Sequence, residues 1–376
     1  MLQTKNGMNE FPLLEESEGI PLFYPYISEK AKDEVLDTLN SRWIGQGPKV
    51  DNFEKQFSAK LAPNHFSLAT GSGTDSLHLS YILSNITKDD EVITPVFTCT
   101  ATNLPLLYEG AKPIFTDIDP NTLNINVDDI EHRITKKTKA IVSVDYGGIP
   151  SNYEKLRSIC DSYNLTFISD AAQSLGTKFL GKSICEFADL TNYSFQAIKT
   201  ITTADGGMVV IKNRDLYEKA KRLRWFGIDR SAKQKGIWEN DISEIGYKYQ
   251  MTDLSACLGL AALDDLDYLI NYRKKLLNSY VKEINNPNVN VLHINNSNGT
   301  SSSPWLCTLI VKERRLDLMN KLRANGIESA QVHYRNDRYS VFGGRKSDLP
   351  IMDDLEKKYL VLPLHHKVNL FDIKKI

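Results

Sequence analysis

The chemistry of this chain centres on Lys199, the single lysine of the stretch from Asn192 to Gly207. It follows Ile198 and precedes a run of threonine and isoleucine, so its surroundings are β-branched and half apolar. Such surroundings lower the pKa of an ammonium group and leave an amine that can attack carbonyl compounds. A lone lysine is more often simply exposed to solvent, so the residues that accompany Lys199 must decide between the two interpretations.

A second candidate is the turn Gly71–Thr74, between a predicted strand over residues 66–70 and a predicted helix over residues 77–83. This order places free backbone N–H groups and the positive end of a helix dipole where an anion can bind. The turn matches neither the P-loop nor the complete dinucleotide-binding pattern. It predicts a phosphate-binding cup, with plain helix capping as the alternative.

A third candidate is Asp170, which follows a predicted strand over residues 165–169, with Gln173 one helical turn later. Ligands of open α/β sheets gather outside the carboxyl ends of the strands, where Asp145 also falls. Asp170 is therefore predicted to reach the ligand. The alternative is that it only caps the segment that follows.

Strands and helices that alternate along the chain must position these residues. Apolar and β-branched runs predict strands over residues 91–95, 113–116, 140–144, 165–169 and 208–211, the first four separated by helices such as 100–108 and 153–163. Buried parallel strands with helical crossovers are the natural arrangement for this order, so we predict an α/β protein.

A second, smaller domain is expected after a long helical pattern over residues 254–277. It would contain a strand over residues 305–311, a helix over 316–325 and a last strand over 360–364. The predicted division is an N-terminal arm over residues 1–20, a large domain over 21–265 and a C-terminal domain over 266–376.

Composition narrows the classes of partner. Lysine and arginine number 46 against 47 acidic residues, which gives no electrostatic case for nucleic acid or an acidic membrane surface. The five cysteines have no CxxC spacing, which argues against a metal site and a disulfide framework and fits a reducing cytoplasm. No apolar run of 18 residues occurs, so we expect a soluble, cytoplasmic protein that acts on a small molecule.

The three candidates together supply what pyridoxal phosphate requires: an amine for a Schiff base, a carboxylate for the pyridine nitrogen and N–H donors for the phosphate. From about Pro21 to about Leu364 the chain resembles the DegT/StrS-type sugar aminotransferases. The motifs that carry this resemblance are Ile93–Thr98, Gly110–Pro113, Asp170–Gln173, Ser194–Lys199, Thr202–Gly207 and Gly246–Asp253. The resemblance implies the aspartate aminotransferase-like fold of type I, with a mostly parallel central sheet in the large domain and a smaller α+β domain.

The resemblance also implies roles for individual residues. Lys199 resembles the lysine that forms the Schiff base and moves a proton between cofactor and substrate carbon. Asp170 resembles the partner of the pyridine nitrogen, and Gln173 the donor near the phenolic oxygen. The positions that match the phosphate ligands are Gly73, Thr74 and Ser194, and those that match the substrate-side loop are Gly45 and Gln46.

Four positions depart from the family pattern. Cys99 stands where an aromatic ring usually stacks on the pyridine, and Asp145 stands where histidine is frequent. Lys248 and Gln250 replace asparagine and arginine in a segment that resembles one crossing the dimer interface to the neighbouring cofactor phosphate. Lys248 can still meet a phosphate as a point charge and Gln250 as a neutral donor. These changes bear on the substrate more than on the chemistry.

A lysine at position 199 favours amino transfer over the dehydration performed by a branch of the family that has histidine there. The reaction implied is a ping-pong transfer from glutamate to a keto sugar, nucleotide-linked and part of a surface polysaccharide pathway, in a homodimer with active sites at the interface. A smaller phosphorylated ketone is an alternative that suits the cationic neighbourhood of His333, Arg335 and Arg338, unless these residues form a solvated loop. Further alternatives are a regulatory protein that binds the cofactor without turnover, and elimination or decarboxylation chemistry.

Overall fold

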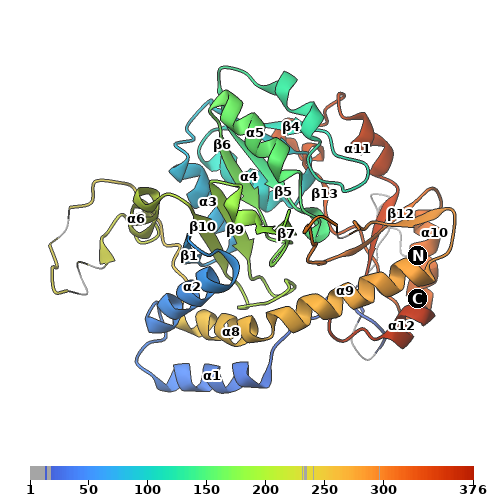
Figure 1. The fold of residues 1–376 in the computed structure, drawn as a ribbon, viewed down its shortest axis with the longest axis horizontal. Helices are drawn as coiled ribbons and strands as arrows, with labels where there is room; N and C mark the ends of the chain where they lie inside the picture. The colour runs from blue at the N-terminus through green and yellow to red at the C-terminus, as the bar shows by residue number, and fades with distance from the viewer. Residues whose placement is uncertain (1–12, 15–17, 231, 233–234, 240, 296) are drawn as a thin grey trace.

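A seven-stranded sheet forms the centre of the computed structural model, which describes residues 13–14, 18–230, 232, 235–239, 241–295 and 297–376 (Figure 1). The strand order is β1-β10-β9-β6-β5-β2-β4. Neighbours from β9 to β4 are parallel, whereas β10 runs antiparallel to both β1 and β9. The predicted α/β class with a mostly parallel sheet is therefore confirmed.

The strands of this sheet are short, and six of the seven agree with predicted ones. Their bounds are β1 Phe66–Thr70, β2 Glu91–Pro95, β4 Lys112–Thr116, β5 Thr138–Val144, β6 Thr166–Asp170, β9 Leu190–Ser194 and β10 Gly207–Ile211. Strand β9 was not predicted, because its centre is made of Thr191, Asn192 and Tyr193 rather than aliphatic residues. The strand is nevertheless buried, and the Asn192 side chain accepts a hydrogen bond from Ser80 Oγ at 2.7 Å.

The strands are apolar on both sides because helices cover both faces of the sheet. Alternate residues point to opposite faces, so Phe167 and Ile168 of β6 belong to two different core clusters. One cluster joins the sheet to α2 Pro48–Leu61, α5 Tyr153–Tyr163 and α8 Asp253–Asp264. The other joins it to α3 Gly73–Leu83, α4 Thr100–Tyr108 and α6 Arg214–Leu223. Helix α1 Glu29–Asn40 packs outside this layer, against α8.

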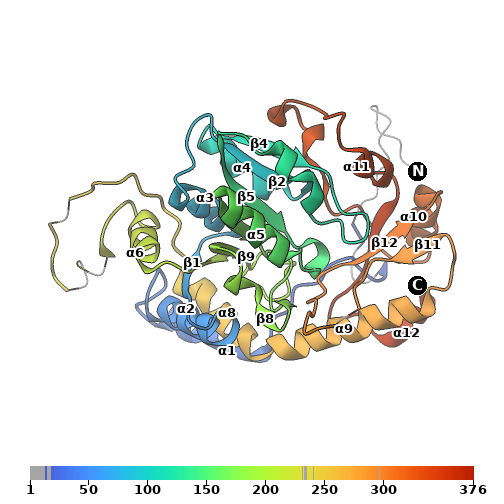
Figure 2. The same ribbon diagram turned by 45° about the horizontal axis from the view of Figure 1, so that its top comes forward.

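A smaller antiparallel sheet lies at the far end of a long helix, α9 Leu266–Glu283 (Figures 1 and 2). Its strand order is β11-β12-β14, and it forms a separate core with α9, α10 and α12. The bounds in this part are β11 Val289–Val291, β12 Cys307–Val311, α10 Arg315–Ala324, α11 Pro350–Leu355, β14 Tyr359–Leu362 and α12 Leu370–Lys375.

The helix predicted over residues 254–277 is two helices, α8 and α9, that meet at Asp265. Asp264 and Asp265 are repelled by the negative C-terminal end of the α8 dipole and attracted by the positive N-terminal end of the α9 dipole. This electrostatic preference gives a physical reason for the break between the two helices. The Asp265 carboxylate also accepts a hydrogen bond from Tyr26 at 2.9 Å.

The proposed domain boundary at residues 265 and 266 coincides with this junction, and it remains a proposal. The C-terminal part also returns to the large domain, because β13 Tyr334–Arg335 forms a separate two-stranded sheet with β3 Phe97–Thr98, which follows β2 in the chain. A short hairpin, β7 Lys178–Phe179 with β8 Lys182–Ser183, completes the strands. Most of the predicted N-terminal arm, residues 1–12 and 15–17, lies outside the described residues. Among the described residues, no helix combines the length and apolarity needed to cross a membrane.

Candidate active site

The carboxyl edge of the large sheet gathers the residues singled out from the sequence. In the strand register Gly207 of β10 pairs with both Thr70 of β1 and Ser194 of β9. Asp170 ends β6 and pairs with Asn192 of β9. Because β10 is antiparallel, its first residue lies at the same edge as the last residues of the parallel strands. The phosphate cup, Asp170 and the segment that carries Lys199 therefore meet at one edge.

Lys199 lies on a closed loop between β9 and β10. The Phe195 N–H donates to Gly206 O at 2.8 Å and the Thr203 N–H donates to Phe195 O at 2.9 Å, which ties the two ends of the loop together. A turn in which the Lys199 N–H donates to Gln196 O at 2.9 Å then fixes the lysine backbone. Backbone hydrogen bonds within the loop thus fix its conformation, and the Lys199 side chain lies near Asp170 at the sheet edge.

The amine of Lys199 is enclosed although the residue as a whole is half-buried. Burial lowers its pKa from 10.5 to about 8, while the charges of Cys99 and Asp170 oppose this shift. The nitrogen lies 3.8 Å from the ring centroid of Trp305. At pH 7 about one molecule in ten then carries a neutral, nucleophilic amine at this position.

Asp170 is buried next to this amine. Thr102 Oγ1 donates to one of its carboxylate oxygens at 2.7 Å, and the Ala172 N–H donates to the other at 3.1 Å. Burial raises the pKa of the Asp170 carboxyl, while these two hydrogen bonds and the charge of Lys199 oppose that rise. The carboxylate is therefore fixed in orientation, and a cationic or N–H partner would stabilise its buried negative charge.

Asp145, at the end of the neighbouring strand β5, faces away from this site. Its carboxylate accepts from the Ser151 N–H and from Tyr153 OH, both at 2.8 Å. Of the two acids predicted near the strand ends, only Asp170 is electrostatically coupled to Lys199 among the described residues.

The turn after β1 is shaped to leave backbone donors free. Ser72 caps α3 by accepting from the Asp75 N–H at 3.0 Å, and the helix begins at Gly73, earlier than predicted. The N–H groups of Gly73 and Thr74 lie in the first turn of the helix, where no helix carbonyl is available to accept their hydrogen bonds. A Cβ at Gly73 would lie 2.8 Å from Ser194 Cβ, so the glycine is required where the helix start meets β9.

Gln173 and His333 form a second wall of the site. Gln173 Oε1 accepts from the Gly147 N–H at 2.8 Å, and its Nε2 lies 3.2 Å from His333 Nε2. Burial, helped by the charge of Lys199, lowers the pKa of His333 to about 3, so this imidazole is neutral at physiological pH. His333, predicted to contact the substrate, therefore lies close to Lys199.

Arg335, also predicted to contact the substrate, does not face the site. Its side chain is fully buried and donates to both carboxylate oxygens of Asp337, at 2.6 and 2.7 Å, and to Asp353. A buried guanidinium whose N–H groups are committed to the buried carboxylate of Asp337 is a structural ion pair, and it cannot bind a substrate phosphate without leaving that charge unpaired. The predicted role of Arg335 is wrong.

The remaining predicted cofactor residues differ in position. Cys99 is the N-cap residue of α4, is exposed, and raises the pKa of Lys199, so its thiol faces the same space. Gln250 forms a β-bridge with Thr70 beside the cup, and its buried side-chain oxygen has no partner among the described residues. Lys248 is exposed, with its nitrogen 3.6 Å from the ring centroid of Trp225.

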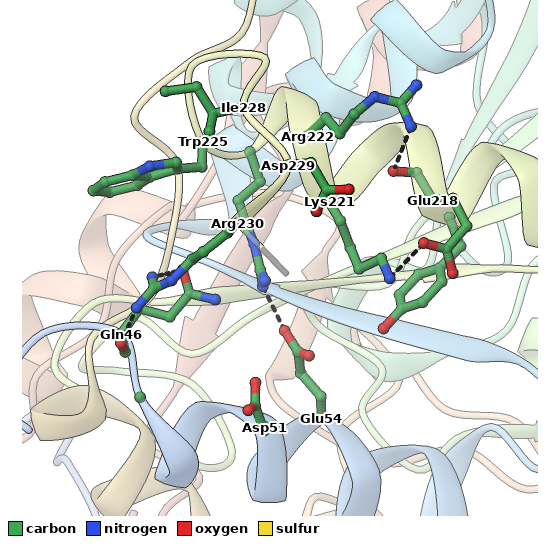
Figure 3. Close-up of a pocket in the computed structure, with 13 residues that line it drawn as sticks. Gln46, Asp51, Glu54, Glu218, Lys221, Arg222, Trp225, Ile228, Asp229 and Arg230 are labelled. Atoms are coloured by element: carbon green, nitrogen blue, oxygen red, sulfur yellow. Dashed lines mark hydrogen bonds and ion pairs between the residues drawn. The ribbon is translucent and has the colours of Figure 1, made fainter. Parts of the chain in front are cut away.

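The turn with Gly45 and Gln46 borders a separate pocket of about 240 Å³ (Figure 3). Arg230 donates to the side chain of Gln46 at 2.6 Å and also to its backbone carbonyl, and the Asp253 N–H donates to Gly45 O at 2.7 Å. Other side chains of the pocket form ion pairs, as in the Arg224 and Glu54 pair at 2.5 Å. A substrate contact by Gly45 or Gln46 remains a prediction.

Two residues of the site were not predicted. Thr102 is a hydroxyl in the first turn of α4, four residues after the end of the Ile93–Thr98 motif, and this position at a helix start was a usable signal. Trp305 lies more than a hundred positions from Lys199 in the chain, and no spacing in the sequence connects the two.

Comparison with known proteins gives consistent matches. The model of the DegT/DnrJ/EryC1/StrS aminotransferase family matches residues 25–376. GDP-perosamine synthase of Escherichia coli O157:H7 is 34% identical, over 92% of this chain and 93% of that protein. The spore coat polysaccharide biosynthesis protein SpsC of Bacillus subtilis is 30% identical, over 95% of both chains. The structure of Spr1654 from Streptococcus pneumoniae in its PLP form has a TM-score of 0.87 and 29% identity, over 95% of this chain and 96% of that one.

The residues at the sheet edge fit pyridoxal phosphate. An enclosed amine of lowered pKa, a buried and oriented carboxylate, and a helix start left open by Gly73 match the aldehyde, the pyridine nitrogen and the phosphate of that group. Gln250, which forms a β-bridge beside the cup, has a buried side-chain oxygen without a partner among the described residues, and rotation of this amide would present its nitrogen there as a neutral donor.

Replacing Lys199 with methionine should stabilise the cofactor-free protein. Below pH 8 both the folded and the unfolded protein carry the ammonium, and the folded protein bears the cost of enclosing it. Between about pH 8 and 10.5 the unfolded protein alone holds the proton, so this cost disappears as the pH rises. We expect Lys199→Met to raise the free energy of unfolding by roughly 1–3 kcal/mol at pH 7, and by much less at pH 10.

Urea unfolding of the cofactor-free proteins at the two pH values measures this difference. Lys248→Met is the matched control, since it removes an exposed lysine that also lies over a tryptophan ring, and it should show no such pH-dependent gain. A Lys199→Met protein no more stable than the wild type at pH 7 would show that the amine is not enclosed.

Bound pyridoxal phosphate should protect Cys99 from alkylation. Cys99 is exposed and faces the space around Lys199, whereas Cys160, Cys185, Cys257 and Cys307 are buried. Iodoacetamide should therefore modify one thiol in the native protein without cofactor, and several-fold more slowly with cofactor bound. Mass spectrometry of the labelled peptide gives the rates, and Cys99→Ser, which should take up no label, identifies the thiol. Equal rates with and without cofactor would place Cys99 outside the cofactor site.

Proposed function

Because this chain belongs to the DegT/DnrJ/EryC1/StrS aminotransferase family, we propose that it transfers an amino group from glutamate to a nucleotide-linked keto sugar. The chain is a pyridoxal phosphate-dependent transaminase of fold type I, which confirms the class and cofactor predicted from the sequence. The donor, the acceptor and the order of the steps are the proposed part.

The observation that carries the proposal is the enclosed amine of Lys199 beside the fixed carboxylate of Asp170. When bound, pyridoxal phosphate supplies an aldehyde that can carry an amino group and a ring that withdraws electrons from the reacting carbon. In our proposal Asp170 holds the pyridine nitrogen protonated. Lys199 takes a proton from the substrate carbon and returns it, a task for which a pKa near the working pH is suited.

The phosphate would be held by the start of α3, where Gly73 and Thr74 offer their N–H groups, and by the hydroxyl of Ser194. Gln173 would donate near the phenolic oxygen, supported by the neutral His333. Because this imidazole is neutral, it places no further positive charge next to Lys199. We propose His333 as a contact for the substrate.

A sugar acceptor in polysaccharide biosynthesis is supported by the relatives. One is named GDP-perosamine synthase and another is named a spore coat polysaccharide biosynthesis protein. The alternative of a small phosphorylated ketone relied on a cationic neighbourhood. This alternative is weakened because the Arg335 side chain is paired with Asp337 and does not face the site. We place the reaction in the cytoplasm, which the five free cysteines support.

We further propose that the active protein is a homodimer. The segment between α6 and α8 extends away from the body of the protein (Figures 1 and 2). Its described residues include exposed apolar side chains, among them Trp238 and Ile245, which are 74% and 84% exposed. Such side chains favour burial against another surface. A second copy would cover them, and Lys248, which is exposed nearby, could then meet the neighbouring cofactor phosphate.

The test separates the two halves of the reaction. Cofactor-loaded protein is mixed with glutamate in the absence of an acceptor, and the keto acid released is measured. We expect up to one keto acid per active site, because in a ping-pong reaction the donor product leaves before the acceptor binds. The protein is then freed of glutamate and offered a panel of nucleotide-linked keto sugars and phosphorylated ketones, with the aminated product identified by mass spectrometry.

Variants assign the roles in this experiment. Lys199→Ala should release no keto acid, and Asp170→Asn should release it far more slowly. Asp145→Asn is the matched control, because it changes an equally buried carboxylate that faces Tyr153 instead of the site. Full activity of Lys199→Ala would contradict the proposal. Keto acid without an aminated product would indicate elimination or decarboxylation, and bound cofactor that never reacts with a donor would indicate a regulatory protein.

A further inference from the structure

The indole ring of Trp305 is the aromatic surface against which the Lys199 amine rests. The lysine nitrogen lies 3.8 Å from the ring centroid, well within the range in which a cation is attracted to an aromatic face. The two residues belong to different parts of the fold, since Lys199 lies on the β9–β10 loop and Trp305 lies two residues before β12. The contact therefore joins the C-terminal part of the chain to the reactive residue.

The Trp305 ring is held in place by a hydrogen bond and by two ring contacts. Its Nε1–H donates to Ile198 O at 2.9 Å, on the residue that precedes the lysine, and its backbone N–H donates to Gly147 O at 2.9 Å. Phe23 stacks on it with ring centroids 5.5 Å apart, and His333 stacks at 6.1 Å. The side chain is 1% exposed, so neither the ring nor the lysine contact can shift freely.

The charges around the amine are weak compared with the cost of enclosing it. Asp170 from β6 and Cys99 from the start of α4 favour the ammonium, whereas the neutral His333 beside β13 supplies no counter-charge. Among the described residues no salt bridge to Lys199 is formed. An aromatic face attracts the ammonium without accepting its proton, so it can hold the charge without fixing the proton as a salt bridge would.

We propose that Trp305 is a positioning residue for Lys199, whose ring face holds the free ammonium and whose indole N–H fixes the backbone beside it. The proposal rests on the proposed role of Lys199. Whenever the amino group is carried to or from a substrate, Lys199 must be free of the cofactor and hold a proton within reach of the substrate carbon. The Trp305 ring supplies a fixed place for the lysine in that condition.

A purely structural role is the competing explanation, because Trp305 also belongs to an apolar core cluster. The two explanations differ in what happens to the proton on Lys199. A core residue changes the stability of the protein, whereas a cation-binding ring changes the pKa of the lysine that it faces. The experiment must therefore measure that pKa in protein that remains folded.

The measurement is competitive acetylation of cofactor-free protein by a brief pulse of acetic anhydride across a range of pH. Mass spectrometry of the peptide that contains Lys199 gives the fraction modified, and the pH dependence gives the pKa of this one amine. In Trp305→Leu, which lacks the aromatic face, we expect the pKa of Lys199 to fall by about one. Trp305→Phe keeps a ring and should recover most of the wild-type value.

A second measurement keeps the shape of the ring, in case Trp305→Leu does not fold. Fluorinated tryptophans are incorporated at all four tryptophan positions, and fluorine withdraws charge from the aromatic face at nearly constant size. The pKa of Lys199 should then fall stepwise with the number of fluorine atoms. Trp225→Leu is the matched control, because Trp225 makes the same contact with Lys248 at 3.6 Å and should leave the pKa of Lys199 unchanged.

The outcomes separate this inference from the proposed function. The inference is overturned if folded Trp305→Leu and the fluorinated proteins show the wild-type pKa at Lys199, or if Trp225→Leu changes that pKa to the same extent. The labelling uses no cofactor and no substrate, so it reports on Trp305 whether or not amino transfer occurs. Failure of the proposed function appears separately, as the absence of keto acid from glutamate.

Discussion

The enclosure of one amine is the constraint on which the rest of this structure depends. Removing the Lys199 ammonium from water is unfavourable, and the protein offsets only part of that cost, through the charge of Asp170 and the ring of Trp305. Full compensation by a close salt bridge would keep the lysine protonated and chemically inert. The incomplete compensation leaves a pKa of about 8, close to the pH at which the amine must both gain and lose a proton.

The register of the sheet brings the other groups to this amine. The strand β10 starts where β1 and β9 end, so Gly207 joins the phosphate cup to the loop that carries Lys199. Both Gly73 and Gly207 are required by close packing, since a Cβ on Gly207 would lie 2.3 Å from Ser72 O. The C-terminal part then closes the site from the other side with Trp305 and His333. The strand register and the close packing of the backbone thus bring the candidate site together, and the side chains then provide its reactive groups.

Local residue patterns were sufficient to predict the mostly parallel sheet, the turn between β1 and α3, and the approach of Asp170 to Lys199, because each depends on short buried strands and on where they end. The phosphate-binding role of the turn stays a prediction. Strand β9 was missed since its central residues are polar, and the partner that lets Asn192 be buried, Ser80, lies on another element that no periodicity reveals. Arg335 was misassigned because its partner Asp337, only two residues away, binds it inside the core, and charge in a sequence does not show burial. Trp305 could not be predicted, since its contact depends on how the two parts of the chain pack.

The central claim, that Lys199 is the residue to which the cofactor binds covalently, can be tested by one measurement. The protein loaded with pyridoxal phosphate is reduced with borohydride, which makes the bond between cofactor and lysine permanent, and is then digested and analysed by mass spectrometry. Our account predicts the phosphopyridoxyl group on the peptide that contains Lys199. Finding it instead on another lysine, such as Lys248, or on no lysine, would contradict the account.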